Sequence, residues 1–469
     1  MKVLRRLAVM LALSFFALSL GLVYWQVARA EELLAHPANR RLTLMESKVI
    51  RGGIFDRDGE ILAQTVVSDG IAQRVYPKGE MLEPLLGYAT LQHGSAGLEG
   101  GLADLLLGLQ HATPGQRLQR FLELPRQGND VVLSLDAGLQ KIAYDGLKGK
   151  IGSAVALDPR TGQVLALVSQ PSYDPVDLDQ HWEEIIQRAG SPLQNHAFSL
   201  FPPGSAMKVV TSVALFNAGI DTTDLYHCEG SAVINGQRIS EQNSKAHGWV
   251  NYHMALAASC NTYFATKAVQ GGAARFLAAA GAFGFGQEIP FELPVARSSI
   301  MNASHGGPLP SEMDDNILAA SAFGQGEVLV SPFHMALITA GIANHGVIMT
   351  PYIVEKVLAD QQTVVYQARP KPWLTALTEE QAQKVSGAMI SAVNEGTAAP
   401  GALPEVQVAA KTGSAEPGGE VLTHAWYIAF APAAAPEIAV AVMIENGGTG
   451  GGAAAPIARE MMRYALERK

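Results

Sequence analysis

The sequence contains few cysteines and few charged residues, and both scarcities narrow the range of functions that the protein can have. Only two cysteines, Cys228 and Cys260, occur among 469 residues. The run His227-Cys228-Glu229 lacks the paired ligands of a zinc site, so we expect no metal and no other cofactor. Charged residues make up 16 % of the chain and its formal net charge is −9, so nothing in the composition suggests a surface for nucleic acid. Nucleic acid is therefore not an expected partner.

The N-terminal 30 residues carry a targeting signal. Lys2, Arg5 and Arg6 precede Leu7–Trp25, a run of 19 residues without a charge that is long enough to span a membrane. Because basic residues mark the cytoplasmic end of a span, we expect a single-pass anchor with the rest of the chain outside the cytoplasm. Ala28-Arg29-Ala30 also fits a signal-peptide cleavage site, but the apolar run is longer than a usual signal core, which favours a retained anchor.

In either case the two cysteines lie in a compartment where disulfides persist. A Cys228–Cys260 disulfide and two separate buried thiols remain open alternatives.

The stretch Leu200–Phe216 predicts a loop that turns into a buried helix. Pro202-Pro203-Gly204 blocks a helix before Ser205, and apolar residues recur at helical spacing after it, so we expect a helix from Ser205 to about Asn217. Residues three apart share a helix face, which brings the Lys208 amine within reach of the Ser205 hydroxyl. A neutral buried lysine can take a proton from serine, and free N–H groups at a helix N-terminus can bind an oxyanion. The pair predicts a nucleophile beside its base.

Two later motifs add to this pair: Ser259-Cys260-Asn261 and Lys411-Thr412-Gly413. The ordered combination S-x-x-K, S-x-N and K-T-G is found in penicillin-binding proteins and class A β-lactamases. From Arg51 to Pro456 the chain resembles the class B, monofunctional penicillin-binding proteins. This resemblance implies an α+β fold in which helices flank a five-stranded antiparallel sheet, with an additional helical subdomain.

The segment that follows the anchor resembles the non-catalytic pedestal of that family. Asp56-Arg57-Asp58-Gly59 between two apolar runs is a hairpin signal, and Gly97-Leu98-Glu99 adds to the likeness. We therefore expect an anchor at 1–30, a pedestal at 31–129 and a transpeptidase domain at 130–469. About a hundred residues separate the anchor from the strand Val131–Leu135, which is too few for the glycan-polymerising domain of bifunctional family members.

In the third domain, strand patterns at both ends enclose helical patterns, as expected for an α+β architecture. The expected strands are Ser153–Leu157, Gln163–Ser169, Val406–Ser414, Ala425–Ala431 and Ile438–Glu445. Expected helices include Asn251–Ala258, Pro332–Asn344 and one from Pro456 to about Glu467, besides a polar helix at Glu31–Arg41. Phe323–Glu327 and Gly447–Gly452 are expected to be glycine-rich turns.

The resemblance implies acyl transfer on peptides that end in D-Ala-D-Ala, with β-lactams as covalent inhibitors. Ser205 would attack the penultimate D-Ala carbonyl while Lys208 takes its proton. Ser259 would bridge the two lysines and pass the proton to the leaving amine, and Asn261 would hold Lys208 and the substrate amide. The backbone N–H groups of Ser205 and Ser414 would form the oxyanion hole.

The third motif is expected to bind the substrate. Lys411 supplies positive potential for the terminal carboxylate and disfavours a charged Lys208. The hydroxyls of Thr412 and Ser414 can bind the same carboxylate. Gly413 lets the substrate backbone approach the strand closely.

Three residues depart from the family pattern: His196 stands in place of an arginine, Phe201 in place of a tyrosine and Ser414 in place of a frequent threonine. None of the three is the nucleophile or its base, so these departures leave only the acceptor side of the substrate site undetermined. His424 and Trp426 are expected to be packing residues rather than catalysts.

Two other functions remain as alternatives. A D,D-carboxypeptidase or a β-lactam-hydrolysing or sensing member of the superfamily would use the same motifs, and a scaffold would use none of them. The anchor, the pedestal and the long interval between Ser259 and Lys411 favour a membrane-bound transpeptidase that cross-links peptidoglycan stem peptides during growth or division. The resemblance also implies a partner, a multi-span membrane protein that polymerises glycan.

Overall fold

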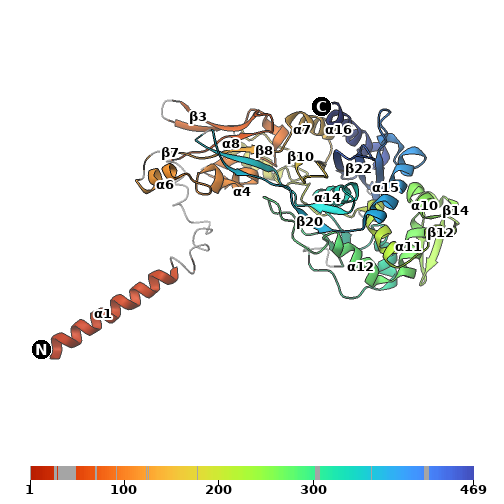
Figure 1. Ribbon diagram of the computed structural model, residues 1–469, viewed down its shortest axis with the longest axis horizontal. Coiled ribbons are helices and arrows are strands. Elements are labelled where there is room, and N and C mark those ends of the chain that lie inside the picture. The colour runs from red at the N-terminus through yellow and green to blue at the C-terminus, as the bar shows by residue number, and fades with distance from the viewer. Residues whose placement is uncertain are drawn as a thin grey trace.

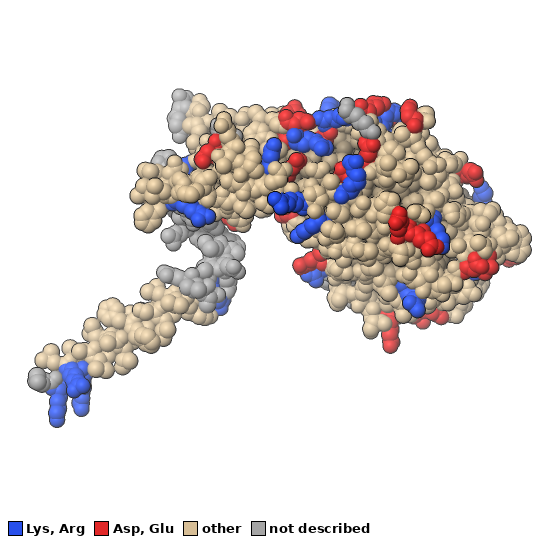
Figure 2. All heavy atoms as spheres, viewed as in Figure 1, with Lys and Arg blue, Asp and Glu red and all other residues tan. Residues whose placement is uncertain are grey.

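The computed structural model describes residues 2–25, 29, 49–68, 71–90, 92–122, 124, 126–176, 178–301, 307–360, 362–416 and 422–468. The N-terminal helix α1 (Lys2–Val23) is long and apolar enough to cross a membrane (Figure 1). Basic side chains gather at the N-terminal end of this helix, and the rest of its surface carries none (Figure 2). The expected helix Glu31–Arg41, and Ala28 and Ala30 of the cleavage motif, lie outside the described residues.

A five-stranded antiparallel sheet forms the centre of the larger part of the body, which confirms the predicted sheet. Its order is β10 (Val164–Gln170), β9 (Gly152–Leu157), β23 (Ile438–Ile444), β22 (His424–Ala431) and β21 (Ala409–Ala415). All five expected strands are present. The two N-terminal strands pair directly with a strand from the C-terminal end, so both ends of the domain share one core.

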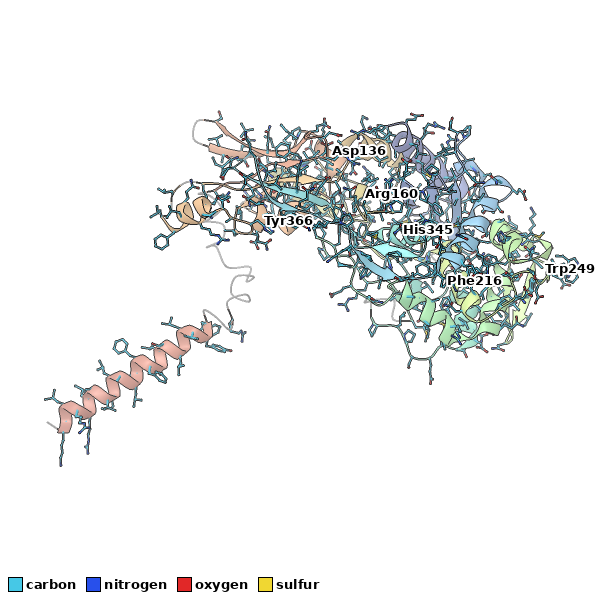
Figure 3. All side chains as sticks on the ribbon, in the orientation of Figure 1. Asp136, Arg160, Phe216, Trp249, His345 and Tyr366 are labelled. Carbon is cyan, nitrogen blue, oxygen red and sulfur yellow. The ribbon has the colours of Figure 1, made fainter. Side chains whose placement is uncertain are left out.

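Helices cover both faces of this sheet because successive side chains of its strands point to opposite sides. Trp426 and Ile428 of β22 pack in the core that contains α14 (Pro332–Ala343), whereas Tyr427 packs with α7 (Ala137–Leu147) and α16 (Ala455–Glu467). Asp136 caps α7, since its carboxylate accepts hydrogen bonds from the backbone N–H groups of the first helical turn. Figure 3 shows Asp136 on the pedestal side of the domain and Trp249 at the far end.

The remaining parts of the domain are mostly helical. Its other helices are α8 (Leu178–Gln187), α9 (Lys208–Asn217), α10 (Tyr252–Ala258), α11 (Asn261–Gly271), α12 (Ala273–Ala282), α13 (Asp315–Ser321) and α15 (Glu379–Asn394). Short hairpins lie at the far end of this region: β11 (Tyr226–Cys228) with β14 (Gly248–Val250), and β12 (Ser231–Ile234) with β13 (Gln237–Ser240).

A second sheet of six strands forms the pedestal. Its order is β19 (Thr363–Gln367), β18 (Val354–Ala359), β8 (Asp130–Leu133), β2 (Ile54–Phe55), β3 (Ile61–Ser68) and β4 (Ile71–Val75). The β2–β3 pair confirms the predicted hairpin, whose turn is held by Asp56. Three of the six strands come from residue 130 and beyond, so both sides of the expected boundary contribute to this sheet.

The N-terminal end of the described body joins the pedestal through a short parallel pair. β1 (Val49–Ile50) pairs with β7 (Arg126–Gln127), which follows helix α6 (Pro114–Phe121). The small helices α4 (Gly97–Gly101) and α5 (Ala103–Leu106) lie under the sheet with Leu98 and Leu106 in the core.

Candidate active site

Ser205 lies just after a sharp bend. Gly204 has a φ of 53° and begins a 3-10 turn, Gly204–Met207, that continues directly into α9. The sequence predicted one helix from Ser205 to Asn217, whereas the structure tightens its first turn. A Cβ at Gly204 would lie 2.6 Å from the Ser414 carbonyl oxygen, so this bend requires glycine. The bend leaves Ser205 partly exposed while Lys208 is fully buried.

The Lys208 amine sits at the centre of a polar cluster. Its Nζ lies 3.1 Å from Ser205 Oγ, 2.6 Å from the Ser259 carbonyl oxygen and 2.7 Å from Asn261 Oδ1. Burial lowers the pKa of Lys208 to about 8, although the Glu241 carboxylate opposes this shift. A neutral amine has two N–H groups and one lone pair. The two shorter contacts can take the N–H groups, which leaves the lone pair for the Ser205 hydroxyl.

Ser259 connects the two lysines. Its hydroxyl accepts a hydrogen bond from Lys411 Nζ at 2.8 Å and lies 3.3 Å from Lys208 Nζ. Burial, together with the charge of Lys208, holds the pKa of Lys411 well below its usual value. A positive charge on Lys208 disfavours one on Lys411, and the reverse, so the two amines do not both hold an extra proton. A proton taken from Ser205 can therefore pass between them through the Ser259 hydroxyl.

The Lys-Thr-Gly motif lies in the edge strand β21, directly against the nucleophile turn. A Cβ at Gly413 would lie 2.7 Å from the Pro203 carbonyl oxygen, so the strand approaches the turn this closely because Gly413 has no side chain. Thr412 and the partly exposed Ser414 follow Lys411 along the same strand. The structure thus brings together all eight residues proposed from the sequence: Ser205, Lys208, Ser259, Asn261, Lys411, Thr412, Gly413 and Ser414.

The glycine turn at Phe323–Glu327 contacts the Ser205 turn from the other side. Gly204 N donates a hydrogen bond to the Gly324 carbonyl oxygen at 2.9 Å. Gly324 has a φ of 77°, and a Cβ there would lie 1.9 Å from the Gly204 carbonyl oxygen. The turn therefore acts through backbone contact with the residue before Ser205.

Comparison with known protein families identifies two domains in this chain. Residues 152–463 match the penicillin binding protein transpeptidase domain, and residues 51–131 match the penicillin binding protein A dimerisation domain. The chain belongs to the penicillin-binding protein transpeptidases. The matched regions contain the five-stranded sheet and the start of the pedestal, respectively.

Full-length relatives support this assignment. The chain is 36 % identical to the peptidoglycan D,D-transpeptidase PbpA of Mycobacterium tuberculosis, over 99 % of both chains. It is 30 % identical to the peptidoglycan D,D-transpeptidase MrdA of Acinetobacter baumannii, over 84 % of this chain and 66 % of that protein. The ceftriaxone acyl-enzyme complex of penicillin-binding protein A from M. tuberculosis aligns with a TM-score of 0.82 at 32 % identity, over 90 % of this chain and all of that one. The predicted family and fold are confirmed.

Sequence reasoning missed Glu241, which is buried beside Asn261. Its carboxylate accepts hydrogen bonds from the backbone N–H groups of Asn261 and Thr262, each at 2.8 Å. Burial raises the pKa of Glu241, but these bonds and the charge of Lys208 outweigh it and the pKa is lowered overall. Glu241 therefore stays ionised and fixes the start of α11. It lies in a polar segment 20 residues before Asn261, where no motif marks it.

Both cysteines join Glu241 and His247 in one group, here called the Cys–Glu–His cluster (Cys228, Glu241, His247 and Cys260). One donor atom from each residue lies within 4.8 Å of the others. Both cysteines are free thiols, so the structure has two separate buried thiols rather than a Cys228–Cys260 disulfide. Two thiols, an imidazole and a carboxylate are a donor set that suits tetrahedral Zn²⁺. The expectation of no metal considered only the residues next to Cys228, and it overlooked Glu241 and His247.

The departures from the family pattern cluster beside the nucleophile loop. His196 lies with Nε2 2.9 Å from the Gly190 carbonyl oxygen and Nδ1 3.0 Å from Glu445. The Phe201 ring lies between the rings of His196 and His424. Its centroid is 6.3 Å from that of His196 and 5.8 Å from that of His424. Next to this group, the indole N–H of Trp426 donates to the Pro202 carbonyl oxygen at 2.9 Å. These side chains hold the loop that precedes Ser205.

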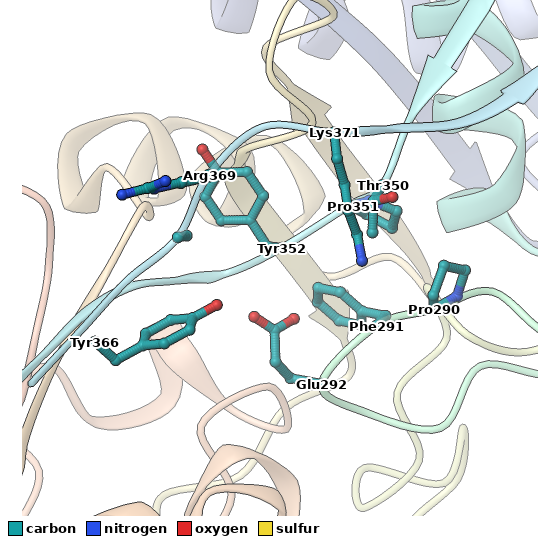
Figure 4. A pocket seen from close by; sticks show the side chains of 10 residues that line it. Pro290, Phe291, Glu292, Thr350, Pro351, Tyr352, Tyr366, Arg369 and Lys371 are labelled. Atoms are coloured by element: carbon teal, nitrogen blue, oxygen red, sulfur yellow. The ribbon is translucent and has the colours of Figure 1, made fainter. Parts of the chain in front are cut away.

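A separate hollow of about 400 Å³ lies beside β18 and β19. It is lined by Pro290, Phe291, Glu292, Thr350, Pro351, Tyr352, Tyr366, Ala368, Arg369 and Lys371. Figure 4 shows the Glu292 carboxylate and the Tyr366 hydroxyl facing this hollow. Because none of the eight site residues lines it, the hollow is distinct from the site around Ser205.

Proposed function

We propose that the protein is a serine D,D-transpeptidase that cross-links peptidoglycan stem peptides through an acyl-enzyme on Ser205. The observation that carries this proposal is the continuous chain of contacts from Ser205 through Lys208 and Ser259 to Lys411. It supplies a base next to the nucleophile and a path for the proton in a single buried site.

In the first half-reaction Ser205 Oγ attacks the penultimate D-Ala carbonyl carbon, and neutral Lys208 takes the hydroxyl proton. The backbone N–H groups of Ser205 and Ser414 bind the oxyanion. When the C–N bond to the terminal D-Ala breaks, the proton returns through Ser259 to the leaving amine. In the second half-reaction an acceptor amine attacks the ester, gives up its proton by the same route, and Ser205 regains its hydroxyl.

The carboxylate of the terminal D-Ala binds to the third motif. A substrate anion favours protonation of Lys411, whose charge is disfavoured while the site is empty of anions. The hydroxyls of Thr412 and Ser414 donate to the same carboxylate, and Gly413 lets the substrate backbone lie along β21. Asn261 positions the substrate amide. A β-lactam carries an equivalent carboxylate and amide, so it acylates Ser205 and blocks the site.

The protein works at the outer surface of the cytoplasmic membrane. α1 is a single-pass anchor whose basic residues stay in the cytoplasm. Residues 31–129 and 130–469 lie outside it as the pedestal and the transpeptidase domain, and the second of these also contributes β8, β18 and β19 to the pedestal sheet. A monofunctional transpeptidase needs nascent glycan strands as substrate. We expect a multi-span membrane polymerase to supply them through contact with the anchor and the pedestal.

Incubation with lipid-linked peptidoglycan carrying D-Ala-D-Ala stems tests this function, with muropeptide analysis by mass spectrometry. Cross-linked dimers and released D-Ala are expected from the intact chain, and neither from Ser205→Ala. Released D-Ala without dimers would identify a carboxypeptidase. Rapid turnover of a β-lactam in parallel would identify a β-lactamase. Either result would overturn the transpeptidase proposal.

A further inference from the structure

Helix α6 of the pedestal presents its apolar side to the solvent. Leu118 and Phe121 are 58 % and 83 % exposed, and Leu122 and Leu124, just after the helix, are 53 % and 49 % exposed. These four residues are here called the α6 apolar face. Surface helices of globular proteins normally turn their apolar side to the core.

The side of α6 that packs against the pedestal is polar instead. Gln116 is 3 % exposed and its Nε2 donates to Asn129 Oδ1 at 2.9 Å, inside the protein. Gln116 also exchanges hydrogen bonds with Thr113 across the start of the helix, at 2.9 and 3.2 Å. The helix is therefore fixed with its apolar face outward, so the exposure of this face does not result from loose packing.

The position of α6 in the chain indicates what covers this face. α6 leads into β7, and β7 pairs with β1, the first strand of the body after the anchor helix α1. The end of the pedestal that carries α6 is thus the end to which the membrane tether attaches. Figure 1 shows α6 beside β7, at the opposite end of the body from β12.

The charge around the α6 apolar face fits a membrane surface. The sequence of α6 contains two arginines, Arg117 and Arg120, and no acidic residue, although the whole chain has a net charge of −9. Apolar and basic side chains on one short amphipathic helix are typical of segments that lie in the interface of a bilayer with anionic lipids.

We propose that α6 lies in the outer headgroup region of the same bilayer that holds α1, with Leu118, Phe121, Leu122 and Leu124 inserted among the lipids. This second contact fixes the tilt of the pedestal relative to the membrane, which a single anchor helix does not. Interfacial helices insert to a depth of about 5–10 Å, so shallow acyl positions are the ones this face reaches.

The test uses the full chain in nanodiscs that contain only this protein and lipid. An environment-sensitive NBD fluorophore is attached to Phe121→Cys and, as a control, to Val233→Cys, which is 71 % exposed on β12 at the far end of the body. Wild-type protein measures background labelling of its two buried thiols. We expect blue-shifted emission and quenching by shallow doxyl lipids at position 121 alone, stronger in anionic than in neutral discs.

Further variants separate lipid contact from other causes. Leu118→Ser with Leu122→Ser should reduce the quenching at position 121 while acylation of Ser205 by penicillin is unchanged. Equal emission and no quenching at positions 121 and 233 would overturn the proposal. A blue shift that occurs only in native membranes, and not in lipid discs, would also overturn it and would assign the face to a membrane protein partner.

Discussion

The dependence of acylation on pH tests the role of Lys208 as a neutral base. Lysine accepts a proton only in its neutral form, and burial lowers the pKa of Lys208 to about 8. With this pKa, about 10 % of the molecules carry neutral Lys208 at pH 7 and about 90 % at pH 9. The second-order rate constant for acylation by a penicillin should therefore rise about tenfold from pH 7 to pH 9 and level off above it.

Removing the buried Glu241 carboxylate is a second way to change the pKa of Lys208. The charge of Glu241 raises the pKa of Lys208, so Glu241→Gln should move the midpoint of the profile to lower pH. Glu292→Gln is the matched control, because the Glu292 carboxylate also accepts hydrogen bonds from two backbone N–H groups but lies in the separate hollow. Its midpoint should stay at that of the wild type.

Stopped-flow measurement with a fluorescent penicillin gives these rate constants from pH 6 to pH 10. Circular dichroism at each pH checks that the fold is intact, and Ser205→Ala measures hydrolysis of the penicillin by the buffer. A flat profile over this range would refute the neutral-base mechanism. An unchanged midpoint in Glu241→Gln would refute the electrostatic coupling of Glu241 to Lys208.

Three more predictions concern the surroundings of the nucleophile. Asn261→Ala removes the amide oxygen 2.7 Å from Lys208 Nζ and should slow acylation about 10- to 100-fold in the same assay. Gly324→Ala places a Cβ 1.9 Å from a backbone oxygen and should lower both the Tm and the acylation rate, whereas Gly272→Ala, also at positive φ but with open space around its Cβ, should cost only its backbone strain, about 1–3 kcal/mol of folding free energy; equal losses would contradict the steric argument. The Cys–Glu–His cluster should bind one Zn²⁺ per chain, detected by elemental analysis and by a lower Tm after chelation. His247→Ala should lose this metal and His227→Ala should keep it, and metal-free wild-type protein after purification with added Zn²⁺ would refute the site.

The grouping of the eight candidate site residues could be predicted because each belongs to a short motif with local geometry. Proline and glycine before Ser205 force the bend, and a spacing of three residues puts Lys208 beside it. The strands of the five-stranded sheet were likewise predictable, since their apolar runs are bounded by clear turn residues. The 3-10 form of the first turn differed, because backbone contact with Ser414 and Gly324 tightens it. The expected glycine-rich turn Gly447–Gly452 also differed, since its second half begins a π-helical turn, Gly450–Ala454, that leads into α16.

Other features depend on contacts between distant parts of the chain, and no local pattern reveals them. Glu241 lies beside the site only because α11 begins next to it, and Glu241 and His247, which share the connection between β13 and β14, meet Cys228 and Cys260 only in the folded chain. The pedestal sheet takes β18 and β19 from residues 354–367, far beyond the expected boundary at residue 130. The outward face of α6 was also not predictable, because an amphipathic pattern does not show which side is buried.

The most direct test of the central claim is to locate the acyl group. Wild-type protein, Ser205→Ala and Ser199→Ala are incubated with a fluorescent penicillin, separated by denaturing electrophoresis and analysed by peptide mass mapping. Ser199 is the matched control because it precedes the nucleophile in the same loop and has no contact with Lys208 among the described hydrogen bonds. The account predicts a stable adduct on Ser205 in wild type and Ser199→Ala, and none in Ser205→Ala. An adduct that persists in folded Ser205→Ala, or no adduct in folded wild-type protein, would contradict it.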